Sequence, residues 1–521
     1  MESLENPSPS SGLPEAEDWG HGGTWYPGRL SRVNSSAENP SHDPLQSLSL
    51  LAKAEQSVQA LNSLLGPIIA DFSQRGLPLY LVGGSVRDAL LGRLGSDLDF
   101  TTPARPAVVA EILEKHCSVV WDTGIAFGTV SAEHEGQQIE ITTFRSDSYD
   151  GETRNPEVQF GDTLEGDLVR RDFKVNAMAV QLNLVEGRIQ GEFHDPLGGL
   201  KDLVNRVLDT PDIPEISFHD DPLRMLRAAR FVSQLGFGLT PRVQDAMTRM
   251  SSEIQRITAE RIRTELDKLM LGAAPWVGIN ILVNVGLADY IYPEIPAMKL
   301  TQDEHRQHKD VYAHSLQVLR QAIDQEEEPD VVLRWAALMH DCGKPETRAF
   351  SENGQVSFHH HEVVGAKLVR RRMRKLKYSK QMIGDVSQLI YLHMRFHGFG
   401  DGQWTDSAVR RYVADAGPLL PRLHKLVRAD CTTRNKNKAR RLQRTYDQLE
   451  ERIADIAARE DLAKVRPDLD GNEIMSILSI SPGPEVGKAW TFLKDLRLER
   501  GPLDHAEAVT ELRQWWANQR K

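Results

Sequence analysis

The chain has 521 residues and a formal net charge of −11, with 40% hydrophobic residues. A chain of this length is longer than a single hydrophobic core usually supports, so three or four domains are predicted. The acidic total argues against a simple nucleic-acid coat protein, but it is compatible with a local basic face that attracts phosphate.

The cysteines, the N-terminal residues and the longest apolar stretch indicate the cellular compartment of the protein. The 3 cysteines, Cys117, Cys342 and Cys431, are widely spaced and odd in number, so neither a disulfide framework nor a CxxC metal site is expected. The N-terminus "MESLENPSPS" is acidic and polar, unlike a secretory signal. The longest charge-free apolar stretch, residues 273–288, is shorter than the about 20 residues of a membrane span. A cytoplasmic protein without a membrane anchor is predicted.

Taken in chain order, the predicted elements describe a mixed head followed by a helical body. Residues 1–45 are rich in Ser, Pro and Gly and predict a disordered tail. Apolar spacing predicts one helix over residues 46–75, which leads into a strand. Residues up to 205 alternate strand and helix patterns, as in "LYLV", "PAVVAEILEKH", "FGTVSAE" and "QIEITTF". Beyond residue 215 the periodicity is almost wholly helical.

Residues 79–100, "LYLVGGSVRDALLGRLGSDLDF", combine a short strand, a paired-glycine turn and a helix start. Gly83 and Gly84 make the turn, and Ser85 is placed to cap the helix. Backbone N–H groups at such a turn favour a phosphate guest, to which Arg87 adds a full charge.

Asp97 and Asp99 are two residues apart on the extended segment "SDLDF". Because strand side chains alternate, both carboxylates point to one face, where hard oxygen ligands suit Mg²⁺. Glu140 in "QIEITTF" is a candidate third carboxylate. A Gly-Gly turn or an Asp-x-Asp pattern on its own is weak evidence for a site, since most such patterns belong to solvated loops. The two patterns in this order and at this spacing favour a metal-dependent phosphoryl-transfer site.

"GGSVRDALLG" followed by "DLDF" resembles the class II tRNA nucleotidyltransferase and bacterial poly(A) polymerase family. The resemblance implies an α+β fold: a polymerase-β-like head, with a mixed sheet and helices, followed by an all-α neck and body. It also implies that Asp97 and Asp99 hold two Mg²⁺ ions as catalytic residues. Gly83, Gly84, Arg87 and Asp88 then lie around the nucleotide phosphates or form their scaffold.

"RRDFKVNAMA", residues 170–179, is similar to the family's second motif and implies nucleotide contacts for Arg171, Asp172 and Asn176. An arginine can pair bidentately with a triphosphate. An isolated Arg-Arg-Asp would more often be an ordinary surface ion pair, but its place after the catalytic strands favours the binding role.

"HDDPLRMLRAARF", residues 219–231, resembles the family's base-reading motif through Asp221 and Arg224, three apart on an expected helix. A carboxylate accepts from an exocyclic amine and a guanidinium donates to ring acceptors, an edge that cytosine and adenine share. The pair would thus select CTP and ATP without a nucleic-acid template. The alternative is a simple helix salt bridge. Asp220 departs from the family's usual Glu.

A second set of polar residues lies in the helical body and resembles the HD-superfamily phosphohydrolase domain. Converging histidines and aspartates on helices suit a divalent transition metal. The resemblance implies a core metal set of His314, His340, Asp341 and Asp430, with His361 and His393 holding a second ion or contacting phosphate. Taken singly, each histidine is more often a satisfied polar residue.

Two basic runs without acidic side chains, residues 367–380 and 434–444, predict contact with an RNA backbone. For either run alone, a solvated helix face is an equal alternative. No aromatic-interleaved platform is evident, which favours recognition of a folded RNA by shape.

The sequence thus predicts a CCA-adding tRNA nucleotidyltransferase whose partners are tRNA, CTP and ATP, with no protein partner. Its expected domains are a tail (1–45), a catalytic head (46–205), a helical neck that binds nucleotide base and RNA (206–298), an HD domain (299–435) and a helical C-terminal tail (436–521). The nearest alternative is a poly(A) polymerase or a partial CC- or A-adding enzyme. A further alternative is an HD phosphohydrolase with a non-catalytic RNA-binding head.

Overall fold

A computed structural model describes residues 44–121, 124–125, 128–148, 157–161, 163–300, 310–352, 356–398, 404–432, 435–460 and 466–519. The predicted disordered tail therefore lies outside the described residues up to residue 43.

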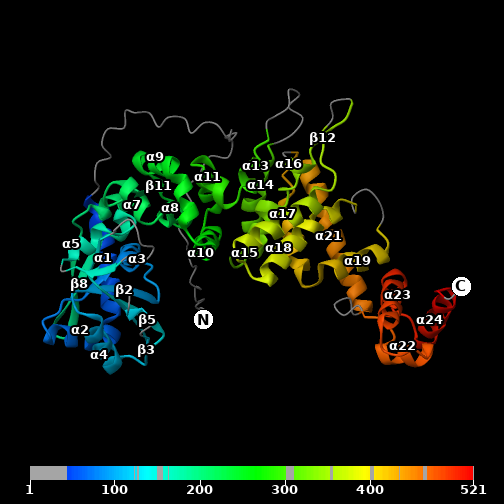
Figure 1. The fold of residues 1–521 in the computed structure, drawn as a ribbon, viewed down its shortest axis with the longest axis horizontal. Helices are drawn as coiled ribbons and strands as arrows, with labels where there is room; N and C mark the ends of the chain where they lie inside the picture. The colour runs from blue at the N-terminus through cyan, green and yellow to red at the C-terminus, as the bar shows by residue number, and fades with distance from the viewer. Residues whose placement is uncertain are drawn as a thin grey trace, which may run out of the picture. The chain divides into compact units, whose positions relative to one another are not determined.

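The head contains a mixed seven-stranded sheet with strand order β3-β4-β5-β2-β1-β8-β9 (Figure 1). Its strands are β1 (Tyr80–Val82), β2 (Asp97–Thr102), β3 (Val119–Trp121), β4 (Thr129–His134), β5 (Gln137–Thr143), β8 (Ala179–Val185) and β9 (Arg188–His194). Within this sheet only the neighbours β2 and β5 run parallel, and helix α4 (Pro106–His116) lies between them in the chain. The other neighbours are antiparallel, with β6 (Arg145–Ser148) and β7 (Glu157–Phe160) forming a separate pair. The predicted α+β head is confirmed.

The single helix expected over residues 46–75 is two helices, α1 (Pro44–Ala60) and α2 (Asn62–Gln74). The Asn62 amide nitrogen donates to the Gly187 carbonyl, and its side-chain oxygen accepts from the Ile189 N–H at 2.8 Å. The helical spacing of apolar residues continues across the break between α1 and α2, so the sequence pattern does not reveal where the first helix ends.

The remaining head helices and the neck lead into the HD region. The head adds α3 (Gly83–Leu90), α5 (Leu164–Val169), the 3₁₀ turn η2 (Lys174–Asn176) and α6 (Gly199–Val204). The neck comprises α7 (Pro214–Asp220), α8 (Leu223–Leu235), α9 (Pro241–Met250), α10 (Ala259–Met270), α11 (Pro275–Asn284), α12 (Leu287–Ile291) and α13 (Glu294–Ala297). The apolar stretch 273–288 forms the largely buried α11 and the start of α12. Among the described residues, no helix is both long and apolar enough to cross a membrane.

The HD region and the C-terminal segment are helical. The helices are α14 (Val311–Ile323), α15 (Val331–Met339), α16 (Lys344–Thr347), α17 (His361–Lys375), α18 (Lys380–Leu392), α19 (Asp406–Ala416), α20 (Leu420–Ala429), α21 (Lys436–Arg459), α22 (Gly471–Leu478), α23 (Pro484–Arg500) and α24 (His505–Gln519). Two-residue strands pair as β10 (Val207–Leu208) with β11 (Gly238–Leu239), and β12 (Ala349–Phe350) with β13 (Val356–Ser357).

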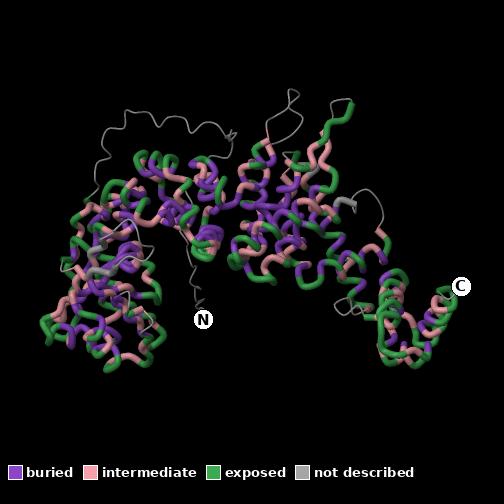
Figure 2. The backbone as a smooth tube through the Cα atoms, in the orientation of Figure 1, coloured by how far each residue is buried: buried purple, intermediate pink, exposed green. Residues whose placement is uncertain are grey.

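Helix α21 belongs to the HD core, whereas the sequence analysis assigned it to the C-terminal tail. Tyr446 lies 4.1 Å from Phe396 between ring centroids, and its hydroxyl donates to the Val427 carbonyl. Leu449 and Ile456 join the same large core. The helices α22 to α24 have a separate small core around Leu493 and Leu512, seen as purple segments within the C-terminal helices of Figure 2. The change of core therefore falls after Arg459, later than the expected boundary at residue 435.

Candidate active site and metal centre

Three carboxylates lie on neighbouring strands at the centre of the sheet. The parallel register pairs Asp99 with Glu140, and Asp97 is two residues before Asp99 on the same face of β2. Burial, and then the negative charge of Glu140, raise the pKa of Asp99, whereas Arg171 opposes the rise. Carboxylates that repel one another in this way fit a site for divalent cations. The metal-ligand role of all three stays a prediction.

The turn before these strands fits closely around the carboxylates. Gly83 has φ +68°, a conformation that L side chains rarely adopt, and a Cβ built there would lie 2.9 Å from Arg171 Nη1 and would displace that guanidinium. Ser85 does not cap α3, because the helix already begins at Gly83. Its hydroxyl instead accepts from the Asp99 N–H at 2.9 Å and donates to the Asp97 carbonyl at 3.1 Å. Ser85 thereby fixes the strand that carries both aspartates.

A cavity of about 290 Å³ opens beside this turn. Its lining includes acidic, basic and uncharged residues: Val82, Asp99, Phe100, Thr129, Glu140, Thr142, Arg145, Arg170 and Arg171. Carboxylates suit a divalent cation and guanidinium groups pair with phosphate, so this lining suits a metal-bound polyphosphate.

Several residues that were predicted to contact the nucleotide form a network of hydrogen bonds and are not among the residues that line the cavity. Arg87 Nη1 donates to the Asn176 side-chain oxygen at 2.7 Å, and the Asn176 amide donates to Asp172 at 2.9 Å. Arg227 Nε donates to the other Asp172 oxygen at 2.8 Å. Burial alone would raise the pKa of Asp172, but Arg227 and its hydrogen bonds lower it to about 2. Asp88 pairs with Arg87 at 2.7 Å. The contact of these residues with a nucleotide stays a prediction.

The base-reading pair does not share a helix face, because α8 begins only at Leu223 and Asp221 is extended backbone before it. The two side chains are nevertheless held in place. Asp221 accepts from Arg261 Nη2 at 2.8 Å. Arg224 donates to the Ser217 hydroxyl at 2.8 Å and to the Arg170 carbonyl at 2.6 Å. The last contact joins the base-reading pair to the cavity.

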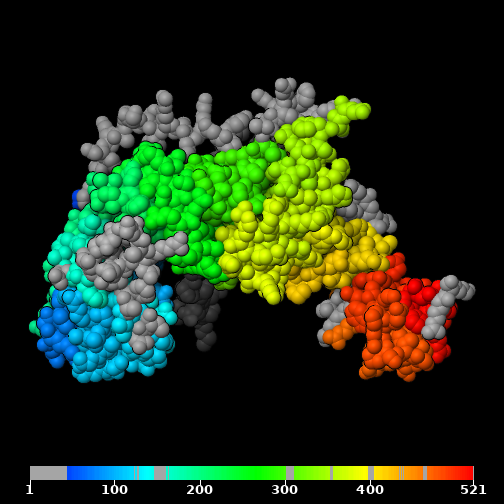
Figure 3. Space-filling view, in the orientation of Figure 1, coloured from blue at the N-terminus to red at the C-terminus, as the bar shows by residue number. Residues whose placement is uncertain are grey.

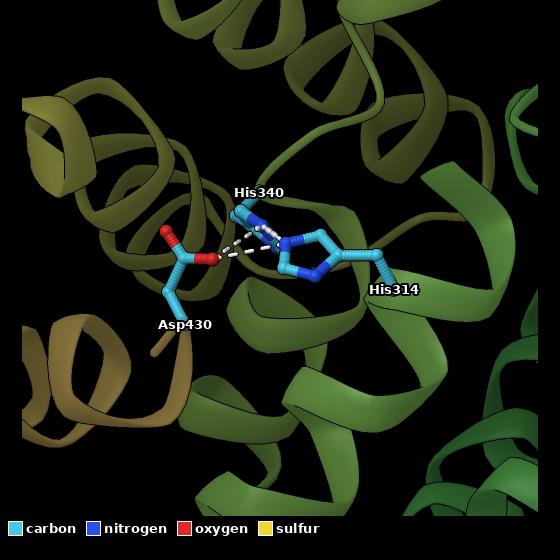
Figure 4. Close-up of side chains that lie close together, drawn as sticks. All are labelled: His314, His340 and Asp430. Carbon is cyan, nitrogen blue, oxygen red and sulfur yellow. Dashed lines mark hydrogen bonds and ion pairs between the residues drawn. The ribbon is translucent and has the colours of Figure 1, made fainter. Parts of the chain in front are cut away.

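All six predicted HD residues converge in two clusters of three, each with ligand atoms within 4.8 Å of one another. The first is His314, His340 and Asp430, drawn in Figure 4, where the side chains come from three separate segments. The second is Asp341, His361 and His393, all buried. Asp341 joins them, because its Oδ1 lies 3.3 Å from His361 Nε2 and its Oδ2 lies 3.3 Å from His340 Nε2.

The orientation of the four imidazole rings tests whether a cation fits. In each ring Nδ1 is bonded outward: His340 to Ala337 O, His361 to Phe358 O, His393 to Ile390 O and His314 to Thr432 Oγ1. The Nε2 atoms of His340 and His314 therefore face each other at 3.3 Å, as do those of His361 and His393. A carbonyl oxygen only accepts, so Nδ1 of His361 and of His393 carries the proton. When neutral, these two rings present two Nε2 acceptors to each other, which a metal between them resolves. The donor set fits.

Electrostatics support the same conclusion. Burial alone would lower the pKa of His340, but Asp341 and Asp430 raise it to about 10. Burial and His340 lower the pKa of His393 to about 3. The buried carboxylates thus draw a positive charge into this cluster, a charge that a divalent ion also supplies.

Three family models match the chain in order. They are the poly A polymerase head domain over residues 79–209, the probable RNA and SrmB-binding site of polymerase A over 236–298, and the HD domain over 311–459. An A-adding tRNA nucleotidyltransferase of Deinococcus radiodurans is 35% identical over 449 residues, which covers 84% of this chain and 95% of that protein. The chain belongs to the tRNA nucleotidyltransferase and poly(A) polymerase family.

Other members of the tRNA nucleotidyltransferase and poly(A) polymerase family align over less of the sequence. A CCA-adding enzyme of Anoxybacillus flavithermus is 39% identical over 246 residues, 47% of this chain and 58% of that protein. Among solved structures, the Bacillus stearothermophilus CCA-adding enzyme in complex with CTP has a TM-score of 0.62 at 24% identity, covering 89% of this chain and 98% of that one. The Thermotoga maritima CCA-adding enzyme complexed with tRNA has a TM-score of 0.55 at 18% identity. These likenesses confirm the fold.

As a member of this family, the chain is a nucleotidyltransferase, and the alternative of an HD phosphohydrolase with a non-catalytic head is set aside. Sequence reasoning missed Arg145 and Arg170, which line the cavity. Arg170 stands beside the motif arginine, so the doubled "RR" was an available signal. Arg145, which donates to Thr129 at 3.0 Å, follows β5 by two residues and has no comparable signal.

Proposed function

We propose that this chain completes the 3′ CCA end of tRNA by adding CMP, CMP and AMP from CTP and ATP. In each step the RNA 3′ oxygen bonds to the α-phosphorus of the nucleotide, the bond to pyrophosphate breaks, and the hydroxyl proton leaves to solvent. The observation that carries the proposal is the hydrogen bond from Arg224 to the Arg170 carbonyl, because Arg170 lines the same cavity as Asp99 and Glu140. Asp97 and Asp99 would hold Mg²⁺, which activates the hydroxyl and neutralises the pyrophosphate.

A second candidate is addition of the terminal A alone. It is favoured by the Deinococcus radiodurans A-adding relative, to which the chain aligns over 95% of that protein, whereas the CCA-adding relatives align over little more than half of theirs. Both candidates use the same cavity and the same Asp221 and Arg224, so the residues described do not separate them.

The two candidates are separated by three tRNA transcripts that end before the CCA, after its first C, or after both C residues. We expect all three to be extended to CCA with Mg²⁺, CTP and ATP, as read by sequencing the product ends. Extension of the CC-ending transcript alone would replace the proposal with A addition. A long A tail, or equal extension of unstructured RNA, would indicate a poly(A) polymerase.

We also propose that the HD clusters bind a divalent transition metal and that this second site hydrolyses a phosphate ester. The proposal is supported by four histidines whose Nδ1 atoms are held outward, by the buried Asp341 and by the half-buried Asp430. A reducing cytosolic location is proposed as well, supported by three cysteines that form no disulfide among the described residues.

Helix α17 is the proposed contact for the RNA backbone on the HD domain. Its buried side carries His361 and Val369, whereas seven cations from its outer side and the following turn are exposed: Lys367, Arg370, Arg371, Arg374, Lys375, Lys377 and Lys380. None of these seven forms an ion pair within the described part of the chain. Residues near 360–390, yellow-green in Figure 3, reach the surface shown there.

The C-terminal end of α17 also meets the neck, which matches an RNA-binding family model. Arg263 donates to the Lys377 carbonyl, and the Tyr378 hydroxyl donates to Asp267 at 2.8 Å. A cationic surface continuous with the neck suits a phosphate backbone, whose binding releases counterions. The other run, 434–444, is exposed at Arg440, Arg441 and Arg444, and Arg434 lies outside the described residues.

Reversing two charges on α17, in Arg371→Glu/Arg374→Glu, should raise the KM for tRNA by about tenfold or more and leave the KM for CTP unchanged. The slope of log affinity against log salt should fall by about 0.7 to 0.9 for each lost phosphate contact. Filter binding across a salt series measures the slope, and steady-state addition kinetics measure the KM for tRNA and for CTP. The matched control, Lys53→Glu/Arg188→Glu, reverses two exposed cations of the head. An equal effect in the control would mean that only net charge matters.

A further inference from the structure

Asp167 is a buried carboxylate beside the cavity that no motif singled out. It lies in the short helix α5, whose N-terminus is capped by the Thr163 side chain accepting from the Gly166 N–H. Its side chain is 0% exposed, and it does not line the cavity. A buried carboxylate destabilises a fold unless charged partners satisfy it, so its presence calls for a physical reason.

Both oxygens of Asp167 are used by the two arginines that line the cavity. Oδ1 accepts from Arg170 at 2.7 Å (Nη2) and 3.1 Å (Nε). Oδ2 accepts from Arg171 Nη2 at 3.0 Å. Burial alone would raise the pKa of Asp167, but the charges of Arg171 and Arg170 hold it below its usual range. The carboxylate is therefore ionised at neutral pH and orients both guanidinium groups.

This arrangement leaves the rest of the Arg171 guanidinium directed at the reacting region. Nη1 lies 2.9 Å from the position that a Cβ of Gly83 would take, and Asp99 Oδ2 is 3.7 Å from the same position. Only one of the two Nη atoms is bonded to Asp167, so the other remains available to an anion above the glycine turn. A free arginine loses several rotamers on binding, and an arginine fixed in advance avoids that entropic cost.

We propose that Asp167 is a positioning residue that fixes Arg171 in the cavity for contact with the triphosphate of the incoming nucleotide. The inference rests on the proposed nucleotidyl transfer and names one further residue that this reaction needs. It also explains why a full charge is buried behind the cavity wall. Because the triphosphate is common to both substrates, the effect of Asp167 is the same for CTP and ATP, unlike the effect of the base-reading Arg224.

The test compares binding of CTP, ATP and CMP to the purified full chain with Mg²⁺ and without RNA. Asp167→Asn should weaken CTP and ATP each by about 10- to 100-fold, the effect of one charge-assisted hydrogen-bond set, and CMP by less than about threefold. Arg171→Gln should give the same pattern. The double variant should lose clearly less than the sum of the two single losses, because both changes remove the same contact between Asp167 and Arg171.

A purely structural role gives a different result, namely equal losses for CTP and CMP or additive losses in the double variant, and either would overturn the proposal. If Asp167→Asn does not fold, Asp167→Glu keeps the buried charge and shifts the guanidinium by one methylene. That variant should lose CTP affinity and keep CMP affinity, and wild-type CTP affinity in it would also overturn the proposal. Because no RNA is present, the outcome is independent of whether the acceptor is tRNA.

Discussion

Replacing Asp97 and Asp99 together by Ala should abolish nucleotide addition, by at least about 10³-fold in kcat/KM, while tRNA binding is retained. The two carboxylates share one face of β2, and Ser85 fixes the strand through the Asp97 carbonyl and the Asp99 N–H. Without them the site keeps its arginines and its base-reading pair, so substrates still bind but no metal ion is held at the reacting atoms. Single-turnover extension of a tRNA transcript and filter binding measure the two quantities.

The same variant should be at least as stable as the wild type. Burial and Glu140 raise the pKa of Asp99, so above its unfolded pKa the ionised carboxylate makes folding less favourable, and its removal relieves that cost. A lower melting temperature would contradict this. Glu140→Gln is the informative companion: a loss comparable to that of the double variant supports a third metal ligand, whereas near-normal addition excludes one.

The carboxylate pair was predictable because its information is local. A strand, a paired glycine and an alternating Asp-x-Asp lie within 22 residues, and each pattern has a direct structural meaning. The pairing of Asp99 with Glu140 is different in kind. The chain between the parallel strands β2 and β5 passes through α4, β3 and β4, and the sequence does not fix their register. The position of Glu140 beside Asp99 was therefore not predictable, and its role as a metal ligand stays a prediction.

The bonds within the buried polar network had no signal in the sequence. Arg87, Asp172 and Asn176 belong to motifs whose resemblance implies nucleotide contact, which stays a prediction, and in the structure they bond to one another and to Arg227. Asp167 had no signal, because a single Asp in "LEGDLV" is indistinguishable from a surface residue. Whether a charged side chain faces the ligand or supports one that does is decided by tertiary packing, which periodicity does not describe.

In the HD region the six residues that the resemblance implied converge in space. Asp341 Oδ2 lies 3.3 Å from His340 Nε2 and 3.6 Å from His314 Nε2, in the core set that the resemblance implied, while its Oδ1 faces His361. The outward bonds of the four Nδ1 atoms depend on backbone carbonyls such as Ala337 O and Ile390 O. These contacts explain why the histidines are held in place without being simply satisfied polar residues.

Replacing His340 by Ala should remove bound metal from the HD site and leave nucleotide addition within about twofold of the wild type. His340 is 1% exposed and contacts His314, Asp341 and Asp430, so its loss breaks the first triad and disturbs the second. The carboxylate cavity uses none of these residues. Metal content after dialysis, measured by mass spectrometry with the addition rate on the same sample, tests both halves of the prediction.

The matched control is His360→Ala, which removes the neighbouring histidine whose side chain is 82% exposed and belongs to neither triad. It should keep the wild-type metal content. Metal that binds the folded state alone also stabilises it, by about 2.7 kcal/mol at a concentration 100 times its Kd. Chelation should therefore lower the melting temperature of the wild type and of His360→Ala but not that of His340→Ala. Retained metal in His340→Ala would show that the two triads are not the binding site, and a lost addition rate would show that the HD site and the cavity depend on each other.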